Sequence, residues 1–123
     1  MLSGFRVLVV EDEALVAEDL THIITEAEGT VVGPYSSARE ARALLKSDAS
    51  LDAAVLDVNV SDGTITPVLE ALRARNIPTV VYTGGAVPED VGRRHPDLTV
   101  LSKPVRPARL IAELRRVSGK LVA

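Results

Sequence analysis

Short apolar runs alternate along this chain with longer stretches in which apolar residues recur at helical spacing. Five short runs rich in Val, Leu, Ala and Thr lie at residues 5–10, 30–32, 53–56, 79–82 and 98–101. The run at 53–56 has no polar alternation, which is typical of a parallel strand buried on both faces of its sheet. The pattern therefore predicts five strands separated by helices.

The first stretch between these runs predicts an amphipathic helix. Its apolar positions follow the spacing i, i+4, i+7, i+8 and i+11, which places one apolar stripe along a helix. The stripe consists of Val16, Leu20, Ile23, Ile24 and Ala27. We expect Asp12 to cap this helix and Gly29 to end it.

Helix signals also precede or follow the other strands. Ser37 opens a capping box, and Thr66 reads as an N-cap before Pro67 at the first helical position. Any helix within residues 86–96 is short, and the last helix starts near Pro107. The expected buried residues are Ala38, Ala41, Leu44 and Leu45 in the second helix, Val68, Ala71 and Leu72 in the third, and Leu110, Ile111, Leu114, Val117 and Leu121 in the last.

The order of these elements predicts an α/β fold. Strands that alternate with helices form a parallel sheet with helices on both faces. Right-handed crossovers favour a flavodoxin-like, doubly wound sheet of five strands in the order 2-1-3-4-5. The length of 123 residues fits one domain over residues 1–123.

Composition narrows the possible functions. The chain has no cysteine, which excludes disulfides, thiol catalysis and thiolate metal sites. His22 and His95 lie far apart in the sequence, and no run approaches the roughly 20 apolar residues that span a bilayer. We expect a cytoplasmic protein without membrane contact.

Charge is distributed unevenly along the chain. Residues 1–92 hold 15 acidic and 6 basic side chains, whereas residues 93–123 hold 2 acidic and 8 basic ones. Such a split indicates either distinct partner surfaces or a solvated basic helix. Direct nucleic-acid binding is disfavoured, because the net charge is −3 and no reading motif is present.

Polar residues follow four of the predicted strands, and a parallel sheet brings these strand ends to one edge. Glu11 and Asp12 follow the first strand, Asp57 the third, Thr83 the fourth and Lys103 the fifth. Crowded carboxylates need a compensating cation, and a hard ion with oxygen ligands, Mg²⁺, meets this need. Lysine and threonine suit phosphate oxygens. Phosphoryl transfer to the Asp57 carboxylate is the chemistry that this arrangement favours.

Each strand-end residue also has an ordinary structural interpretation. The acids could cap a helix, Thr83 could form a turn and Lys103 could be a solvated charge. A flavin-binding flavodoxin is disfavoured because an acidic loop repels phosphate. An aspartyl-nucleophile phosphatase is disfavoured because the first strand is not followed by an Asp-x-Asp pattern.

In their order along the chain, these motifs resemble the receiver domain of two-component response regulators. The motifs are Val9-Val10-Glu11-Asp12-Glu13, Val55-Leu56-Asp57, Tyr82-Thr83-Gly84 and Ser102-Lys103-Pro104. The stretch from Val81 to Gly85 further resembles the Phe-Ala-Thr-Gly-Tyr stretch of stand-alone alphaproteobacterial receivers.

The resemblance implies a role for each residue. Asp57 accepts a phosphoryl group from a sensor histidine kinase or a phosphotransfer protein. Asp12, Asp57 and the backbone carbonyl of Asn59 bind Mg²⁺, and Glu11 acts largely through water. Lys103 contacts the phosphoryl group, while Thr83 swings toward it and couples phosphorylation to the fourth helix, fifth strand and fifth helix.

Three positions depart from the receiver pattern. The loop after Asp57 is short, Val100 stands where receivers carry a switch aromatic, and Val105 replaces a frequent Phe. The first and second departures fit the alphaproteobacterial subgroup. Gly85 offers no side chain to shield the phosphoryl group, so we expect a short phosphoryl lifetime.

The sequence thus predicts a phosphorylatable receiver without an output domain. It signals by protein contact or phosphoryl exchange, with the basic segment 93–120 as the candidate output surface. It is not expected to be an enzyme beyond Mg²⁺-dependent self-phosphorylation and autodephosphorylation. The alternative is a pseudo-receiver, an interaction module that is not phosphorylated.

Overall fold

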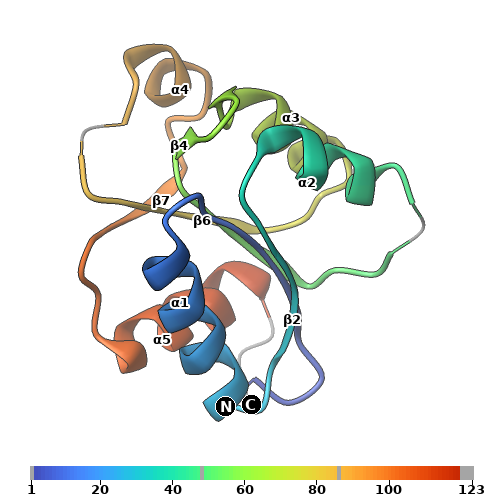
Figure 1. Cartoon of the computed structure of the whole chain (residues 1–123), viewed down its shortest axis with the longest axis vertical. Helices are drawn as coiled ribbons and strands as arrows, with labels where there is room; N and C mark the ends of the chain where they lie inside the picture. The colour runs from blue at the N-terminus through green and yellow to red at the C-terminus, as the bar shows by residue number, and fades with distance from the viewer. Residues whose placement is uncertain (1, 48, 86, 120–123) are drawn as a thin grey trace.

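The computed structural model describes residues 2–47, 49–85 and 87–119, and the main sheet lies at its centre (Figure 1). All neighbouring strands of this sheet are parallel, and their spatial order is β2-β1-β3-β6-β7. The strands are β1 (Arg6–Val10), β2 (Thr30–Tyr35), β3 (Ala53–Leu56), β6 (Thr79–Thr83) and β7 (Thr99–Ser102). This order confirms the flavodoxin-like arrangement predicted from the sequence.

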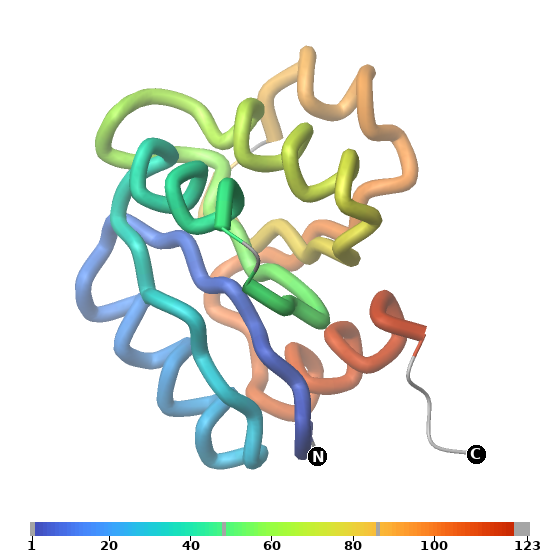
Figure 2. Tube along the Cα trace, turned by 90° about the vertical axis from the view of Figure 1, so that its right-hand side faces the viewer, coloured from blue at the N-terminus to red at the C-terminus, as the bar shows by residue number. Residues whose placement is uncertain are grey.

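Helices cover both faces of the sheet (Figures 1 and 2). The helices α1 and α5 lie on one face, and α2, α3 and α4 lie on the other. Their bounds are α1 (Ala14–Glu26), α2 (Ala38–Leu45), α3 (Thr66–Ala74), α4 (Glu89–Arg94) and α5 (Pro107–Ser118). Within the described ranges, none of the helices has the length and apolar character needed to cross a bilayer.

The alternation of side chains along the strands divides the interior into two apolar cores. Val7, Val9 and Val55 face the core under α1 and α5, whereas Leu8 and Leu56 face the core under α2, α3 and α4. Each fully buried Leu contributes about 1.5–3 kcal/mol relative to an exposed one. Because β1 and β3 are buried from both sides, the positions of their ends are fixed by two cores.

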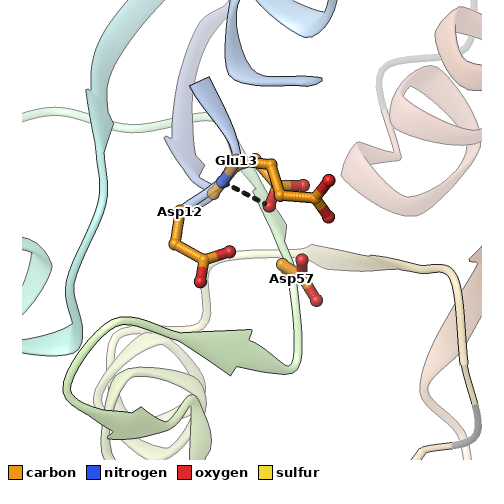
Figure 3. Close-up of side chains that lie close together, drawn as sticks. Asp12, Glu13 and Asp57 are labelled. Atoms are coloured by element: carbon orange, nitrogen blue, oxygen red, sulfur yellow. Dashed lines mark hydrogen bonds between the residues drawn. The ribbon is translucent and has the colours of Figure 1, made fainter. Parts of the chain in front are cut away.

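Two predicted helix caps are wrong. Glu13 rather than Asp12 is the N-cap residue of α1, and its side chain makes no capping bond. Asp12 is instead turned toward the end of β3 (Figure 3). The N-cap position of α3 is occupied by Ile65, so Thr66 is the first helical residue. The helix α1 ends before Gly29, at Glu26.

The loop after Asp57 contains a small hairpin that the sequence reading did not predict. β4 (Asn59–Val60) and β5 (Gly63–Thr64) pair antiparallel, with Asn59 opposite Thr64 and Val60 opposite Gly63. Strands of two residues are too short to show an alternating pattern. The expected buried Leu121 and the end of the basic segment at Lys120 lie outside the described residues.

Candidate functional site

The carboxyl ends of the inner strands bring the predicted site residues to one edge of the sheet. Val10 pairs with Leu56, so Glu11 and Asp57 leave neighbouring strands at the same level. Thr83 pairs with Ser102, which places Lys103 directly after that level. Glu11, Asp57 and Thr83 are each at most 5% exposed. Three buried polar side chains at one sheet edge indicate a site rather than a solvated surface.

Lys103 is the central charge of this cluster. Its Nζ lies 2.9 Å from Asp57 Oδ2, 2.8 Å from Glu11 Oε1 and 3.3 Å from Glu13 Oε1. The same Nζ lies 5.7 Å from the centroid of the Tyr82 ring. Burial alone would lower the pKa of Lys103, but Glu11 and Asp57 hold it well above its usual value. The ammonium is therefore charged at every physiological pH.

Both carboxylate oxygens of Asp57 are held. The backbone N–H of Asn59 donates to Oδ1 at 3.1 Å, and the Lys103 ammonium donates to Oδ2 at 2.9 Å. The Asp57 N–H donates in turn to the carbonyl of Val10 at 2.9 Å. Burial works to raise the pKa of Asp57, but hydrogen bonds from Glu11, Lys103 and Asn59 outweigh it and lower the pKa. An oriented carboxylate that is ionised at neutral pH is a competent nucleophile.

The pKa of Glu11 shifts in the opposite direction to that of Asp57, although both carboxylates contact Lys103. Burial, followed by the hydrogen bond with Asp57, raises the pKa of Glu11 to about 7. Its Oε2 accepts the N–H of Glu13 at 3.2 Å, whereas the buried Oε1 has the ion contact with Lys103 but no bond of hydrogen-bonding geometry. Of these two neighbouring carboxyl groups, Asp57 carries the charge and Glu11 is poised to gain or lose a proton.

The donor set fits a hard divalent cation. One carboxylate oxygen from each of Glu11, Asp12, Glu13 and Asp57 lies within 4.8 Å of the others. Figure 3 shows the side chains of Asp12 and Asp57 converging from the ends of β1 and β3. Mg²⁺ prefers one or two carboxylates and keeps several waters, and the exposed side of Asp12 leaves room for them. The buried Oε1 of Glu11 adds an acceptor with spare capacity.

The remaining predicted residues stand on either side of Asp57. Asn59 begins β4, two residues after Asp57. The Thr83 hydroxyl oxygen accepts the N–H of Gly85 at 3.2 Å, and the Thr83 carbonyl accepts the N–H of Lys103 at 2.9 Å. The structure thus brings Asn59 and Thr83 to the same edge as the acids. The roles assigned to them from the sequence stay predictions.

Two residues of the site were missed by sequence reasoning. Glu13 contacts Lys103, a role that the acidic run after β1 could have suggested. The Tyr82 hydroxyl accepts the N–H of Val105 at 3.2 Å, so this ring fixes the loop that follows Lys103. The sequence contains no signal for this bond, because Tyr82 and the loop after β7 come together only when β6 and β7 pair in the folded protein.

Several solved structures share this architecture. A response regulator receiver protein from Sinorhizobium medicae is 29% identical with a TM-score of 0.84, and the match covers 94% of each chain. SdrG from Sphingomonas melonis is 40% identical with a TM-score of 0.76, over 93% of this chain and 98% of SdrG. The receiver domain of a sensor histidine kinase from Pseudomonas aeruginosa shares the fold at 20% identity, with a TM-score of 0.80. The match covers 95% of this chain and 99% of that one, and that structure has a magnesium ion coordinated in its active-site cleft.

Sequence comparison with curated proteins gives no match, but comparison with family models does. The model of the response regulator receiver domain matches residues 7–115, which include all the strand-end residues described above and every strand except the first residue of β1. Its span excludes a chance match to a single motif. The chain belongs to the response regulator receiver domain family.

Proposed function

We propose that this receiver accepts a phosphoryl group on Asp57 and signals through the change that follows. The observation that carries the proposal is the state of the Asp57 carboxylate. It is buried at the sheet edge, it has a lowered pKa, and it lies 2.9 Å from the ammonium of Lys103. A structural aspartate at a strand end needs none of these features.

The reaction forms a bond between a carboxylate oxygen of Asp57 and the phosphorus of the donor. For a phosphohistidine donor, the P–N bond breaks and its electron pair returns to the imidazole. Lys103 neutralises charge on the equatorial oxygens of the transferring group, and the Asn59 N–H holds the carboxylate in place. Positioning and charge compensation are the main contributions of a protein to phosphoryl transfer.

Asp12, Asp57 and the Asn59 carbonyl are the residues proposed to hold Mg²⁺, with Glu11 acting through water. When bound there, Mg²⁺ would supply positive charge that offsets the repulsion between these carboxylates and the incoming phosphoryl group. The proposal is supported by the 4.8 Å cluster of carboxylate oxygens and by the magnesium reported in the Pseudomonas aeruginosa receiver.

The proposed donor is a sensor histidine kinase or a phosphotransfer protein, and α1 offers it a contact. Leu15 stands at the start of α1, two residues after Glu13, and is 82% exposed. It borders a hollow that also includes Tyr82, Lys103 and Pro104. We expect Leu15→Ala to slow phosphorylation by a protein donor and to leave phosphorylation by a small donor unchanged, because a small donor needs no docking surface.

The proposed output surface is the basic segment 93–120, reached through Thr83. Arg116 donates to Thr99 on β7 at 2.8 Å and to Glu113 at 2.7 Å, so part of its charge is already compensated. The side chain of Arg93 on α4 is 71% exposed. Reversing Arg115 and Arg116 to Glu, with Arg93→Glu as a variant that spares the bonds of Arg116, should weaken partner binding. Unchanged binding in both would remove this surface from the account.

Intact mass after incubation with Mg²⁺ and acetyl phosphate tests the proposal directly. Wild type should gain one phosphoryl group, and Asp57→Asn or the addition of EDTA should abolish the gain. The matched control is Asp90→Asn, which alters an exposed carboxylate in the first turn of α4 and should leave phosphorylation unchanged. A wild type that gains no phosphoryl group and binds no Mg²⁺ would be a pseudo-receiver.

A further inference from the structure

The hairpin that follows Asp57 is fastened to the junction between β2 and α2. The backbone N–H and the hydroxyl of Ser61 both donate to the carbonyl of Ser36, at 3.2 and 3.0 Å. Val60 is 7% exposed and packs in the core under α2 and α3. The tip of the hairpin therefore cannot move without disturbing the start of α2.

Asp62 makes the most direct of these attachments. Its Oδ1 accepts the N–H of Ala38 at 2.8 Å, and its Oδ2 accepts the N–H of Arg39 at 3.0 Å. These bonds lower the pKa of Asp62, the one from Ala38 most strongly. Helices begin with N–H groups that have no partner within the helix, and a carboxylate satisfies them well. Here a residue 24 positions further along the chain provides that carboxylate.

The helix has a second cap that comes from its own N-terminal residue. The Ser37 hydroxyl oxygen accepts the N–H of Glu40 at 3.1 Å. Ser37 thus stabilises α2 locally, whereas Asp62 stabilises α2 and ties it to the hairpin at the same time. Substitution of Ser37 therefore tests helix capping alone, whereas substitution of Asp62 tests helix capping and hairpin positioning together.

The same junction between β2 and α2 also forms a hydrogen bond with the acidic segment at residues 11–13, after β1. The carbonyl of Tyr35 accepts the N–H of Glu11 at 2.9 Å. The junction of residues 35–39 therefore contacts both segments that carry the proposed metal ligands. One segment continues from Glu11 to Asp12, and the other is the hairpin that starts at Asn59. The hydrogen bonds of Asp62 join the hairpin to this junction.

We propose that Asp62 is a positioning residue for the Mg²⁺ site: through Ala38 and Arg39 it fixes the hairpin, and with it the carbonyl of Asn59, relative to Asp12. The inference rests on the proposed function, since it takes Mg²⁺ as the ion. The pairing of Val60 with Gly63 and of Asn59 with Thr64 transmits the position of the tip to Asn59 within two residue pairs. Loss of the Asp62 carboxylate leaves the tip held by Ser61 and Val60 alone, and it leaves the N–H groups of Ala38 and Arg39 without this acceptor.

The test compares Mg²⁺ dissociation constants of wild type, Asp62→Ala, Asp62→Asn and Ser37→Ala by calorimetric titration. Residues that orient metal ligands typically change metal affinity by 10–100-fold, so Asp62→Ala should weaken Mg²⁺ binding by about tenfold. Asp62→Asn keeps one oxygen acceptor and should give a smaller loss. Ser37→Ala should lower the melting temperature as Asp62→Ala does, because each removes a cap of α2, yet leave Mg²⁺ binding unchanged.

The outcomes distinguish this inference from the proposed function. If wild type binds Mg²⁺ and is phosphorylated on Asp57 but Asp62→Ala and Ser37→Ala bind Mg²⁺ equally well, Asp62 is merely a helix cap and the inference fails alone. If wild type binds no Mg²⁺, both fail. Should Asp62→Ala not fold, the isosteric Asp62→Asn carries the comparison, and an affinity equal to that of Ser37→Ala would again overturn the inference.

Discussion

Two loops border Asp57, and they are held in different ways. The hairpin of residues 59–64 bonds to the start of α2 through Ser61 and Asp62 and buries Val60 in a core. In the loop after β6, the bond made by the Thr83 side chain stays within the loop, at the N–H of Gly85. Gly84 and Gly85 are exposed and have no side chain to anchor them.

The difference separates two demands on a receiver. A cation and a carboxylate need ligands at fixed positions, and the hairpin provides them through contacts to a neighbouring element. A conformational response needs a group whose bonds are few and local, so that a new charge can replace them. We interpret the hairpin as the fixed wall of the site and the loop after β6 as its responsive wall.

The largest effect is expected from Lys103→Met, which removes charge from the site and leaves both walls in place. Loss of one preorganised charge partner of the transferring group should slow phosphorylation by a small donor about 100-fold. Mg²⁺ binding should not weaken, because the four carboxylates lose a competing cation. Kinetics by intact mass and a Mg²⁺ titration check both parts. A weaker affinity for Mg²⁺ would mean that Lys103 supports the fixed wall rather than the reaction.

The next effect is a dependence of Mg²⁺ affinity on pH. The pKa of Glu11 lies at about 7 without a bound cation, so Glu11 gains a proton as the pH falls below that value. The cation must then displace this proton, and the Mg²⁺ dissociation constant should rise by up to about tenfold per pH unit below pH 7. Titrations with Mg²⁺ at several pH values between about 6 and 8 measure this dependence. Glu11→Gln should remove the dependence, and a dependence that persists in this variant would assign it to another group.

A smaller effect on rate is expected from Thr83→Ala, which alters the responsive wall. The lost hydrogen bond lies within the loop, so phosphorylation should remain within about fivefold of wild type. The response should suffer more: amide chemical-shift changes at Val100 and along α5, induced by Mg²⁺ with beryllofluoride, should be lost. If Thr83→Ala transmits these changes fully, Thr83 is no part of the coupling.

The smallest effect is expected from Gly85→Tyr. A Cβ added at Gly85 meets no heavy atom within 4 Å, so the backbone surroundings leave room for a side chain to start there. An aromatic ring at this position can cover the phosphoryl group from water and should lengthen its lifetime a few-fold. The decay of phosphorylated protein by intact mass measures it, with Gly85→Ala as the control for the loss of glycine. Equal decay in all three proteins would show that water reaches the phosphoryl group from another side.

Much of the fold could be predicted because local patterns and topology agree. The strand from Ala53 to Leu56 is apolar at every position because it is buried on both faces, and that pattern is readable without a structure. The helical stripe from Val16 to Ala27 is readable for the same reason. The cap of α1 was predicted wrongly because capping competes there with the site, whereas the cap of α3 lies one residue earlier than predicted. Asp12 would satisfy a helix N-terminus, but it is turned toward the neighbouring Asp57 instead.

The site could be predicted as a set of residues but not as a set of contacts. The rule that parallel strands end at one edge sufficed to group Glu11, Asp57, Thr83 and Lys103. The attachment of Asp62 to α2 joins positions 24 residues apart, and the Asp62-Gly63 pair by itself indicates only a turn.

The most direct test of the division into a fixed and a responsive wall is a crystal structure of the wild type with Mg²⁺ and beryllofluoride, which occupies the place of a phosphoryl group on a carboxylate. The account predicts that Asp62 keeps its bonds to the N–H groups of Ala38 and Arg39, while the Thr83 hydroxyl leaves Gly85 and turns toward Asp57. A structure in which Asp62 has moved away from α2, or in which Thr83 still accepts the Gly85 N–H, would contradict it.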